Sequence, residues 1–267
     1  MSGYILCQIK KAEHPYFIEN ISTNIYSIEE LCYYLYHNLY LIDSSIINEG
    51  LCVWLEEELG LAKLAAKLRP HMGKFVSAED VLYPIFKEIN YLTYEELRVL
   101  NGKLALLDQE PVPLRKKHKG DLLVENRMYV NAIRVYQKLL ERDDIDTVRQ
   151  GFKGEIYHNL GCAYSYLFQM EKALECFWKA YLDKKTAGDL SCYLLAYRSI
   201  RSKEEYNRKI KELETDKLQA EILTEAKKEM EEALSRFSEI PEQEVIPEQV
   251  DGMLETLTGE YHRSTGA

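Results

Sequence analysis

The sequence has few of the residue patterns that mark catalytic or metal-binding sites. Its six cysteines include no CxxC pair, its six histidines form no HExxH motif, and no phosphate-binding glycine loop or GxSxG motif occurs. Zinc sites, phosphate cradles and nucleophile elbows depend on these spacings, so we expect no catalytic, metal or cofactor-binding residues. The cysteines lie mostly at apolar helical positions, which is typical of reduced core residues in a cytoplasmic protein.

Basic charge is also scarce. The chain has 34 Lys and Arg against 44 Asp and Glu, for a net charge of −10. Its one dense basic cluster, residues 115–119, has the character of a solvated helix start. Without an excess of cations to neutralise phosphates, nucleic acid is not an expected partner.

Long hydrophobic runs are missing as well. The uncharged run at 31–42 has twelve residues and includes His37 and Asn38, which is too short and too polar for a hydrocarbon core of roughly 30 Å. The first residues show no charged region, apolar stretch or cleavage site of a signal peptide. We therefore expect a cytoplasmic protein that does not enter a membrane.

Helix signals are abundant. Prolines and glycines are few, at 7 and 13, and between residues 27 and 110 a Ser or Thr three times precedes an acid by three residues, which is the spacing of a helix N-cap. These pairs are Ser27–Glu30, Ser77–Asp80 and Thr93–Glu96. We predict a helical bundle over 27–110, after a short extended segment at 1–26 with candidate strands at 4–9 and 16–21. The predicted helices cover 28–42, 49–69, 78–91 with a kink at Pro84, and 94–108.

The second half contains a pattern of small and aromatic residues. Residues 154–187 read GEIYHNLGCAYSYLFQMEKALECFWKAYLDKKTA. Gly161 and Ala173 are predicted to face each other across a tight helix pair, with Tyr164 and Phe177 filling the space around it. This segment resembles the tetratricopeptide repeat of roughly 34 residues. A weaker copy precedes it by 41 residues, so that either the connecting loop or the next helix is longer than usual. Its matching residues are Gly120, Tyr129, Ala132, Tyr136 and Leu139.

The resemblance implies an all-α fold with stacked helical hairpins, an α-solenoid, over 114–200. It also implies a concave groove that binds a peptide or helix. The groove residues carried over from the family are Lys117, His158, Asn159, Ser165 and Tyr166. The alternative is that they are ordinary surface residues.

The C-terminal part is highly charged. We predict one long amphipathic helix over 201–237, because apolar residues recur every three or four positions there. Such a helix caps the end of a repeat stack or pairs with a second copy, and of the two we favour capping. Residues 238–267 contain seven acidic residues and one arginine, which is typical of a disordered acidic tail.

The expected function is a protein-interaction module, an adaptor or scaffold subunit whose partner the sequence does not identify. A second interpretation is a regulatory protein with a helical bundle before its repeats, which changes shape when it binds a peptide. An enzyme with an unrecognised site is a third and less favoured interpretation, since no motif supports it.

Overall fold

The computed structural model describes residues 10–72, 78–238, 252, 255–259 and 262. The chain divides into two compact units, one ending at Leu122 and the other beginning at Leu123. The described residues are overwhelmingly helical, with a single two-stranded sheet. The predicted all-α class is therefore confirmed.

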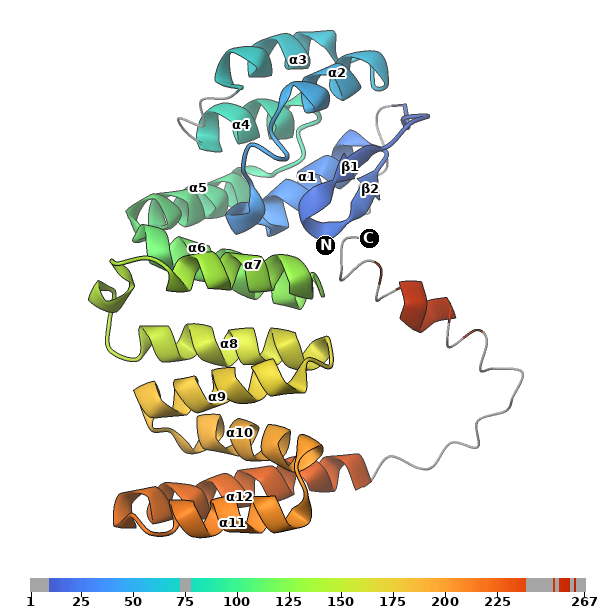
Figure 1. Ribbon diagram of the computed structural model, residues 1–267. Helices are drawn as coiled ribbons and strands as arrows, with labels where there is room; N and C mark the ends of the chain where they lie inside the picture. Colours follow the sequence, from blue (N-terminus) through green and yellow to red (C-terminus); the bar gives the residue numbers. More distant parts are fainter. Residues whose placement is uncertain (1–9, 73–77, 239–251, 253–254, 260–261, 263–267) are drawn as a thin grey trace. The chain divides into compact units, whose positions relative to one another are not determined.

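The first unit begins with a β-hairpin and continues as helices (Figure 1). Strands β1 (Tyr16–Ile18) and β2 (Thr23–Ile25) are antiparallel, with Phe17 opposite Asn24. The candidate strand at 4–9 lies outside the described residues, and the one at 16–21 is real only as far as Ile18. The helices are α1 (Ile28–His37), α2 (Glu49–Glu57), α3 (Ala62–Leu68), α4 (Ala78–Glu88) and α5 (Tyr94–Gln109).

Local cap signals place two of these helices correctly. The Ser27 hydroxyl accepts a hydrogen bond from the Glu30 N–H at 3.2 Å, and Thr93 and Glu96 form a reciprocal capping box at the start of α5. Each side chain satisfies a backbone N–H that the first helical turn leaves unbonded. Ser77 lies outside the described residues, so its predicted cap is not described.

The single helix predicted over 49–69 is wrong, because it is divided into α2 and α3. Gly60 adopts a left-handed conformation with φ of 70°, and the N–H of Leu61 bonds to the carbonyl of Leu55 at 2.7 Å. Glycine has no Cβ to oppose this conformation, so the chain reverses there at little cost. The helix predicted over 28–42 also ends early, at His37, and a short 3-10 helix, Leu39–Leu41, follows it.

Trp54 on α2 belongs to the core of the first unit. Its side chain is buried, its indole N–H donates to the His14 carbonyl at 2.9 Å, and the Tyr16 ring lies 5.7 Å from it, centroid to centroid. The β-hairpin and its preceding residues are thereby packed onto α2, which gives this indole both an apolar environment and a hydrogen-bond acceptor.

The Pro-rich segment at 110–113 starts a helix instead of separating domains. Helix α6 (Val112–Glu125) begins within it, and the division between the units falls later, after Leu122. Proline is compatible with the first turn of a helix, whose N–H groups have no partner within the helix. The division between the units therefore falls within α6 and not at residue 110, where the predicted helical bundle ends.

The second unit is a succession of antiparallel helices. Its complete helices are α7 (Tyr129–Leu140), α8 (Phe152–Tyr166), α9 (Met170–Lys184), α10 (Ala187–Ile200), α11 (Lys203–Leu213) and α12 (Lys217–Ser238). In Figure 1, α7, α8, α9 and α10 follow one another as layers, and each packs on the next. The connection between α7 and α8 is the long one and contains a 3-10 helix, Ile145–Thr147.

The predicted long helix over 201–237 is wrong in one respect, because it is two helices. The chain turns after Leu213, and the Asp216 carboxylate accepts a hydrogen bond from the Gln219 N–H at 2.9 Å, which starts α12. The polar residues 214–217 interrupt the apolar stripe at this point. The stripe is then buried inside the chain, at Leu213, Leu223 and Ala226, and α12 packs on α10.

Trp178, on α9, is half-buried in the second unit. The Tyr193 ring of α10 lies 4.8 Å from its ring, centroid to centroid, and Nζ of Lys209 on α11 lies 4.7 Å above its ring. This contact joins α9, α10 and α11 through one aromatic side chain and one cation.

The tail predicted to be disordered over 238–267 is described only at Ser238, Gly252, 255–259 and His262. Residues 255–259 are helical and exposed, and the Thr256 hydroxyl donates to the Gly252 carbonyl at 2.9 Å. The prediction of a disordered tail stays a prediction. The other residues of the tail lie outside the described part.

Candidate binding surfaces

The close approach of α8 and α9 depends on Gly161. A Cβ built at this position would lie 2.7 Å from Cε1 of Phe177, inside van der Waals contact. Ala173 is fully buried on the same helix as Phe177. A small residue is needed at Gly161, as predicted, because the two helices approach closely there. The atoms nearest to it belong to the Phe177 ring, however, and not to Ala173.

The turn that joins α8 to α9 has a duplicate between α6 and α7. Phe168 and Arg127 occupy the same place in the two turns, with φ of 57° and 61°. The next residues, Gln169 and Met128, have φ and ψ of −84° and 61°, and of −88° and 59°. In both turns the N–H of that residue bonds to the carbonyl five residues earlier, at 3.0 and 2.8 Å. The backbone therefore repeats at an interval of 41 residues.

The same interval relates buried side chains on the helices that follow. Ala132 of α7 and Ala173 of α9 are both fully buried, and Tyr136 and Phe177, four residues further on, are both buried aromatic residues. A small residue followed one turn later by a large ring is thus repeated together with the turn. The repetition predicted from sequence is matched by the backbone and by these burial positions.

His158 does not project freely from α8, because it is bonded to a buried carboxylate. Its Nδ1 lies 2.8 Å from Oδ1 of Asp189 at the start of α10, and the Asp189 side chain is only 1% exposed. The hydrogen bond to Asp189 and a contact with Cys162 raise the pKa of His158 to about 9. The histidine is therefore protonated at neutral pH and connects α8 to α10.

Asp189 has several partners in its buried position. Nζ of Lys184 lies 3.0 Å from its carboxylate, and the Thr186 hydroxyl donates to it. Although burial alone would raise its pKa, the hydrogen bonds from His158, Thr186 and Lys184 outweigh that effect and lower the pKa to about 2. A buried carboxylate with this set of donors remains ionised and holds three segments of the unit together.

Cys162 completes this cluster on α8. It lies four residues after His158, so that both side chains are on one face of the helix, and its sulfur contributes to the raised pKa of His158. A histidine four residues before a cysteine is the sequence signal that could have found this pair. A cysteine nucleophile is normally accompanied by backbone N–H groups that stabilise a developing oxyanion. Cys162 is in the middle of α8, where the neighbouring N–H groups bond within the helix and are not directed at such an oxyanion.

The other predicted groove residues of α8 have different environments. Asn159 is half-buried, and the Ser165 hydroxyl donates to the Gly161 carbonyl of its own helix at 2.9 Å. Tyr166 is 59% exposed and stacks on Tyr129, with ring centroids 4.5 Å apart and planes 7° apart. Tyr166 is thus the predicted groove residue with the most surface available to a partner.

Lys117 belongs to the first unit and is already paired. Its Nζ lies 2.7 Å from Oδ2 of Asp121, and its side chain is only 12% exposed. An ion pair four residues apart on one helix accounts for this lysine without a ligand. Four of the predicted groove residues therefore lie together on α8, namely His158, Asn159, Ser165 and Tyr166. Lys117 belongs to the other unit.

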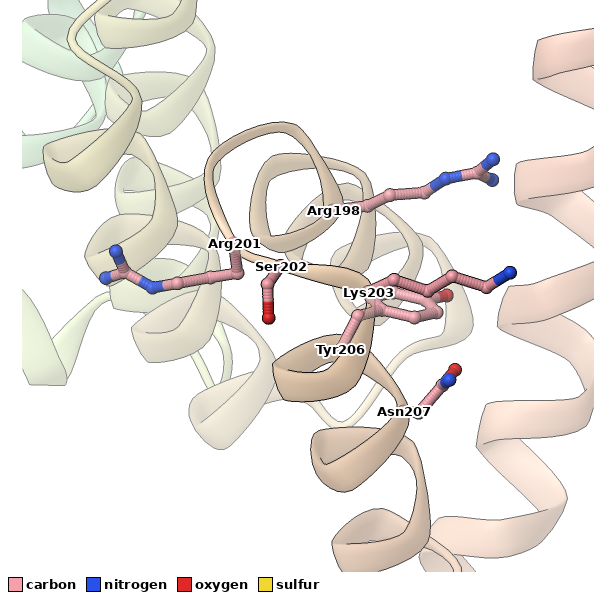
Figure 2. A pocket seen from close by; sticks show the side chains of 6 residues that line it. All are labelled: Arg198, Arg201, Ser202, Lys203, Tyr206 and Asn207. Carbon is pink, nitrogen blue, oxygen red and sulfur yellow. The ribbon is translucent and has the colours of Figure 1, made fainter.

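A basic pocket at the junction of α10 and α11 was not predicted. It has a volume of about 380 Å³, and Arg198, Lys203, Tyr206 and Asn207 line it together with Arg201 and Ser202. Figure 2 shows that Arg201 points away from the other long side chains, and it forms two hydrogen bonds with Glu171. The exposed Arg198 and Lys203, which form no ion pair in the described part of the chain, leave the pocket suited to an anionic group.

Comparisons with known proteins identify no family. No protein-family model, curated protein or solved structure matches the chain. Over the described ranges there is no group of three or more His, Cys, Asp and Glu side chains arranged to hold a metal ion. In the same ranges, no helix combines the length and apolar composition needed to cross a membrane. The resemblance to the tetratricopeptide family thus rests on the residues and the repeated turn alone.

Proposed function

We propose that this chain is a protein-interaction module of the tetratricopeptide type, an adaptor or scaffold subunit that binds a peptide or helix. The observation that carries the proposal is the repetition, after 41 residues, of one turn geometry together with a buried alanine and a buried aromatic ring. Helical repeats of this kind present extended surfaces to partners, which is a more economical account of the duplication than a catalytic role.

The proposed contact surface is the exposed end of α8. Tyr166 and Tyr129 form a stacked pair there, Tyr166 is largely exposed, and Asn159 lies on the same helix. Rigid, exposed aromatic side chains are common among the residues that dominate binding energy. His158 and Ser165 support this surface, because their polar atoms are engaged within the chain.

The basic pocket suggests the chemistry of the partner. Arg198 and Lys203 carry positive charge in a chain whose net charge is −10, and the Tyr206 and Asn207 side chains add polar groups beside them. Cations gathered in a pocket on an acidic protein favour a partner segment with carboxylates, and they increase its rate of association.

The proposal is tested by substitutions on the exposed end of α8 in the full chain. We expect Asn159→Ala and Tyr166→Ala to reduce or abolish the co-purification of partner proteins from native lysate, because both remove contact groups without emptying the core. Arg198→Ala with Lys203→Ala should weaken the same association and reduce its dependence on salt. The bound proteins are compared by quantitative mass spectrometry.

Tyr94→Ala is the matched control, since Tyr94 is 85% exposed but lies in the first unit. Circular dichroism confirms that each variant is folded. The proposal fails if no protein associates reproducibly with the wild-type chain. It also fails if Tyr94→Ala removes partners as effectively as Tyr166→Ala does.

A further inference from the structure

Two half-buried cysteines, Cys162 on α8 and Cys192 on α10, have no part in the proposed function. The other cysteines that the structure describes, at positions 32, 52 and 176, are buried. A buried thiol ordinarily serves as a small apolar group, whereas a thiol that solvent reaches is able to react. The half-buried pair is therefore where thiol chemistry is to be sought.

The hydrogen bond between His158 and Asp189 fixes how α8 and α10 lie against each other. Nδ1 of His158 lies 2.8 Å from Oδ1 of Asp189. Short turns join α9 to both helices, and α9 packs on each of them (Figure 1). Because α9 is antiparallel to both, α8 and α10 run in the same direction.

The two cysteines lie one turn beyond this hydrogen bond. Cys162 follows His158 by four residues, and Cys192 follows Asp189 by three. These steps correspond to rises of about 6 Å and about 4.5 Å, which are nearly equal. In each helix the cysteine also shares the face of the residue before it. The two thiols are therefore at the same level of the same contact between α8 and α10.

The electrostatics of the thiols agree with this register. Burial, followed by the neighbouring Cys162 sulfur, raises the pKa of Cys192 to about 11. The hydrogen bond to Asp189, followed by one with Cys162, raises the pKa of His158 to about 9. Such effects decrease with the distance between the groups. The Cys162 sulfur is therefore a near neighbour of both His158 and Cys192.

A small reagent reaches this pair from solvent, because both cysteines are half-buried and the His158 side chain is 31% exposed. Cys192 is protonated at neutral pH, since its pKa is raised. Cys162 lies beside the imidazolium of His158. A cation stabilises an anionic sulfur, which is the nucleophilic form of a cysteine. Cys162 is therefore the thiol placed to react first.

We propose that Cys162 and Cys192 form a reversible disulfide when the chain meets a hydroperoxide. The Cys162 sulfur attacks the terminal oxygen of the hydroperoxide, an S–O bond forms as the O–O bond breaks, and the alcohol leaves with the thiol proton. The Cys192 sulfur then attacks the sulfenic acid of Cys162, an S–S bond forms as the S–O bond breaks, and the hydroxyl group leaves as water with the second thiol proton. The two thiols together lose two electrons, which reduce the peroxide.

Oxidation thereby adds a covalent connection between the two helices that His158 and Asp189 already join. Disulfides of reducing compartments are usually transient and redox-sensing, and thiol exchange with a reductant restores the two cysteines. The reduced thiols expected from the sequence are thus the resting state of this pair.

Peptide mapping by mass spectrometry on the full chain tests this inference. The reduced protein is exposed to tert-butyl hydroperoxide, its remaining thiols are blocked with N-ethylmaleimide, and it is digested with trypsin without reduction. Cys162 and Cys192 then lie in the separate tryptic peptides 154–172 and 186–198. We expect these two peptides as the predominant linked species, and dithiothreitol should separate them.

Substitutions of the two cysteines identify their roles. Cys162→Ser and Cys192→Ser should each abolish the linked species. In Cys192→Ser the sulfenic acid has no thiol to react with, so dimedone should label position 162. In Cys162→Ser, dimedone should leave position 192 unlabelled. Cys176→Ala is the matched control, because it removes a buried cysteine of the same unit, and its linked species should equal that of the wild type.

The inference is overturned if the wild type yields no link between these peptides, or if either cysteine links mainly to another one. A link between two chains, seen as a dimer on a non-reducing gel, contradicts it as well. Should a serine variant fail to fold, the map of the wild type decides the question, because the two peptides identify the pair without any substitution.

Discussion

The two copies of the repeated turn differ in how their polar residues are used. Both have the same backbone geometry, and each is followed by a buried alanine and a buried ring. Before the turns, at the same interval of 41 residues, Lys117 corresponds to His158 and Asp121 to Cys162. Lys117 and Asp121 pair with each other along one helix, whereas His158 bonds to Asp189 on another helix.

Packing demands explain why some positions repeat and others do not. The turn fixes where a helix can approach its neighbour, so the small and the aromatic residues are constrained by the space available. A polar residue needs only a partner for its charge, and that partner can be local or distant. Repetition is therefore expected to be strict in the core and loose among polar contacts, and each prediction below tests one side of this contrast.

The largest effect is expected at the two aromatic positions. Tyr136→Ala and Phe177→Ala should each lower the free energy of unfolding by about 3–5 kcal/mol, because each removes a buried ring and leaves a cavity. Urea denaturation followed by circular dichroism measures the loss. Tyr94→Ala, at an exposed position, should have little effect. A large loss at only one of the two positions would break their equivalence.

The second effect is a difference in stability loss between the two polar pairs. Asp189→Asn should lower the free energy of unfolding by about 3 kcal/mol, because it leaves the charges of His158 and Lys184 without their buried counter-ion. Asp121→Asn should cost less, because Asp121 is 24% exposed against 1% for Asp189 and pairs within its own helix. The same denaturation experiment compares them. Equal losses would show that burial does not distinguish the two contacts.

The third effect concerns the close approach of α8 and α9. Gly161→Ala should lower the free energy of unfolding by about 1–3 kcal/mol, because the added Cβ meets the Phe177 ring and the helices must shift. Gly102→Ala is the control, since a Cβ there meets nothing within 4 Å. That control should instead stabilise α5 slightly, by up to about 1 kcal/mol. If both variants gain stability, the approach is looser than described.

A fourth effect is a pH dependence. Folding raises the pKa of His158 to about 9, above its ordinary value of about 6.5. The stabilisation is therefore complete below the ordinary pKa and is lost as pH rises through about 9. The opposite holds for Asp189, whose pKa is lowered to about 2, so its stabilisation is lost only as pH falls through that value.

Thermal unfolding between about pH 6 and about pH 10 measures this dependence, which spans the folded and unfolded pKa of the histidine. His158→Gln should lose less stability over that range than the wild type does. The titration of lysines and tyrosines affects both proteins alike, so the difference isolates His158. If the two proteins lose the same stability over this pH range, His158 is not the group responsible for the pH dependence.

Local features of the fold were predictable from the sequence. The caps at Ser27 and Thr93 depend on residues three positions away, and a turn is specified by its own few residues. The break at Gly60 was missed because the apolar pattern of α2 continues into α3, so periodicity alone cannot show that the chain reverses. Gly60 itself was the available signal.

The candidate site was predictable only in part. The residues of α8 could be placed on one helix from their spacing, but the bond of His158 to Asp189 spans 31 residues and depends on how α10 packs. The basic pocket was missed for the same reason, since Arg198 and Lys203 are unremarkable in a charged sequence until Arg201 is paired elsewhere. Which polar residues are satisfied within a chain is a property of the packed structure.

The chain has two tryptophans, and each unit has one. Trp54 is buried in the first unit, and Trp178 lies among aromatic rings beneath Lys209 in the second. Intrinsic fluorescence therefore carries a separate spectroscopic reporter for each unit. With Trp178 replaced by phenylalanine, emission follows the unit before residue 123 alone, and with Trp54 replaced it follows the repeated helices. The order in which the two units melt can thus be read without attaching a dye to either.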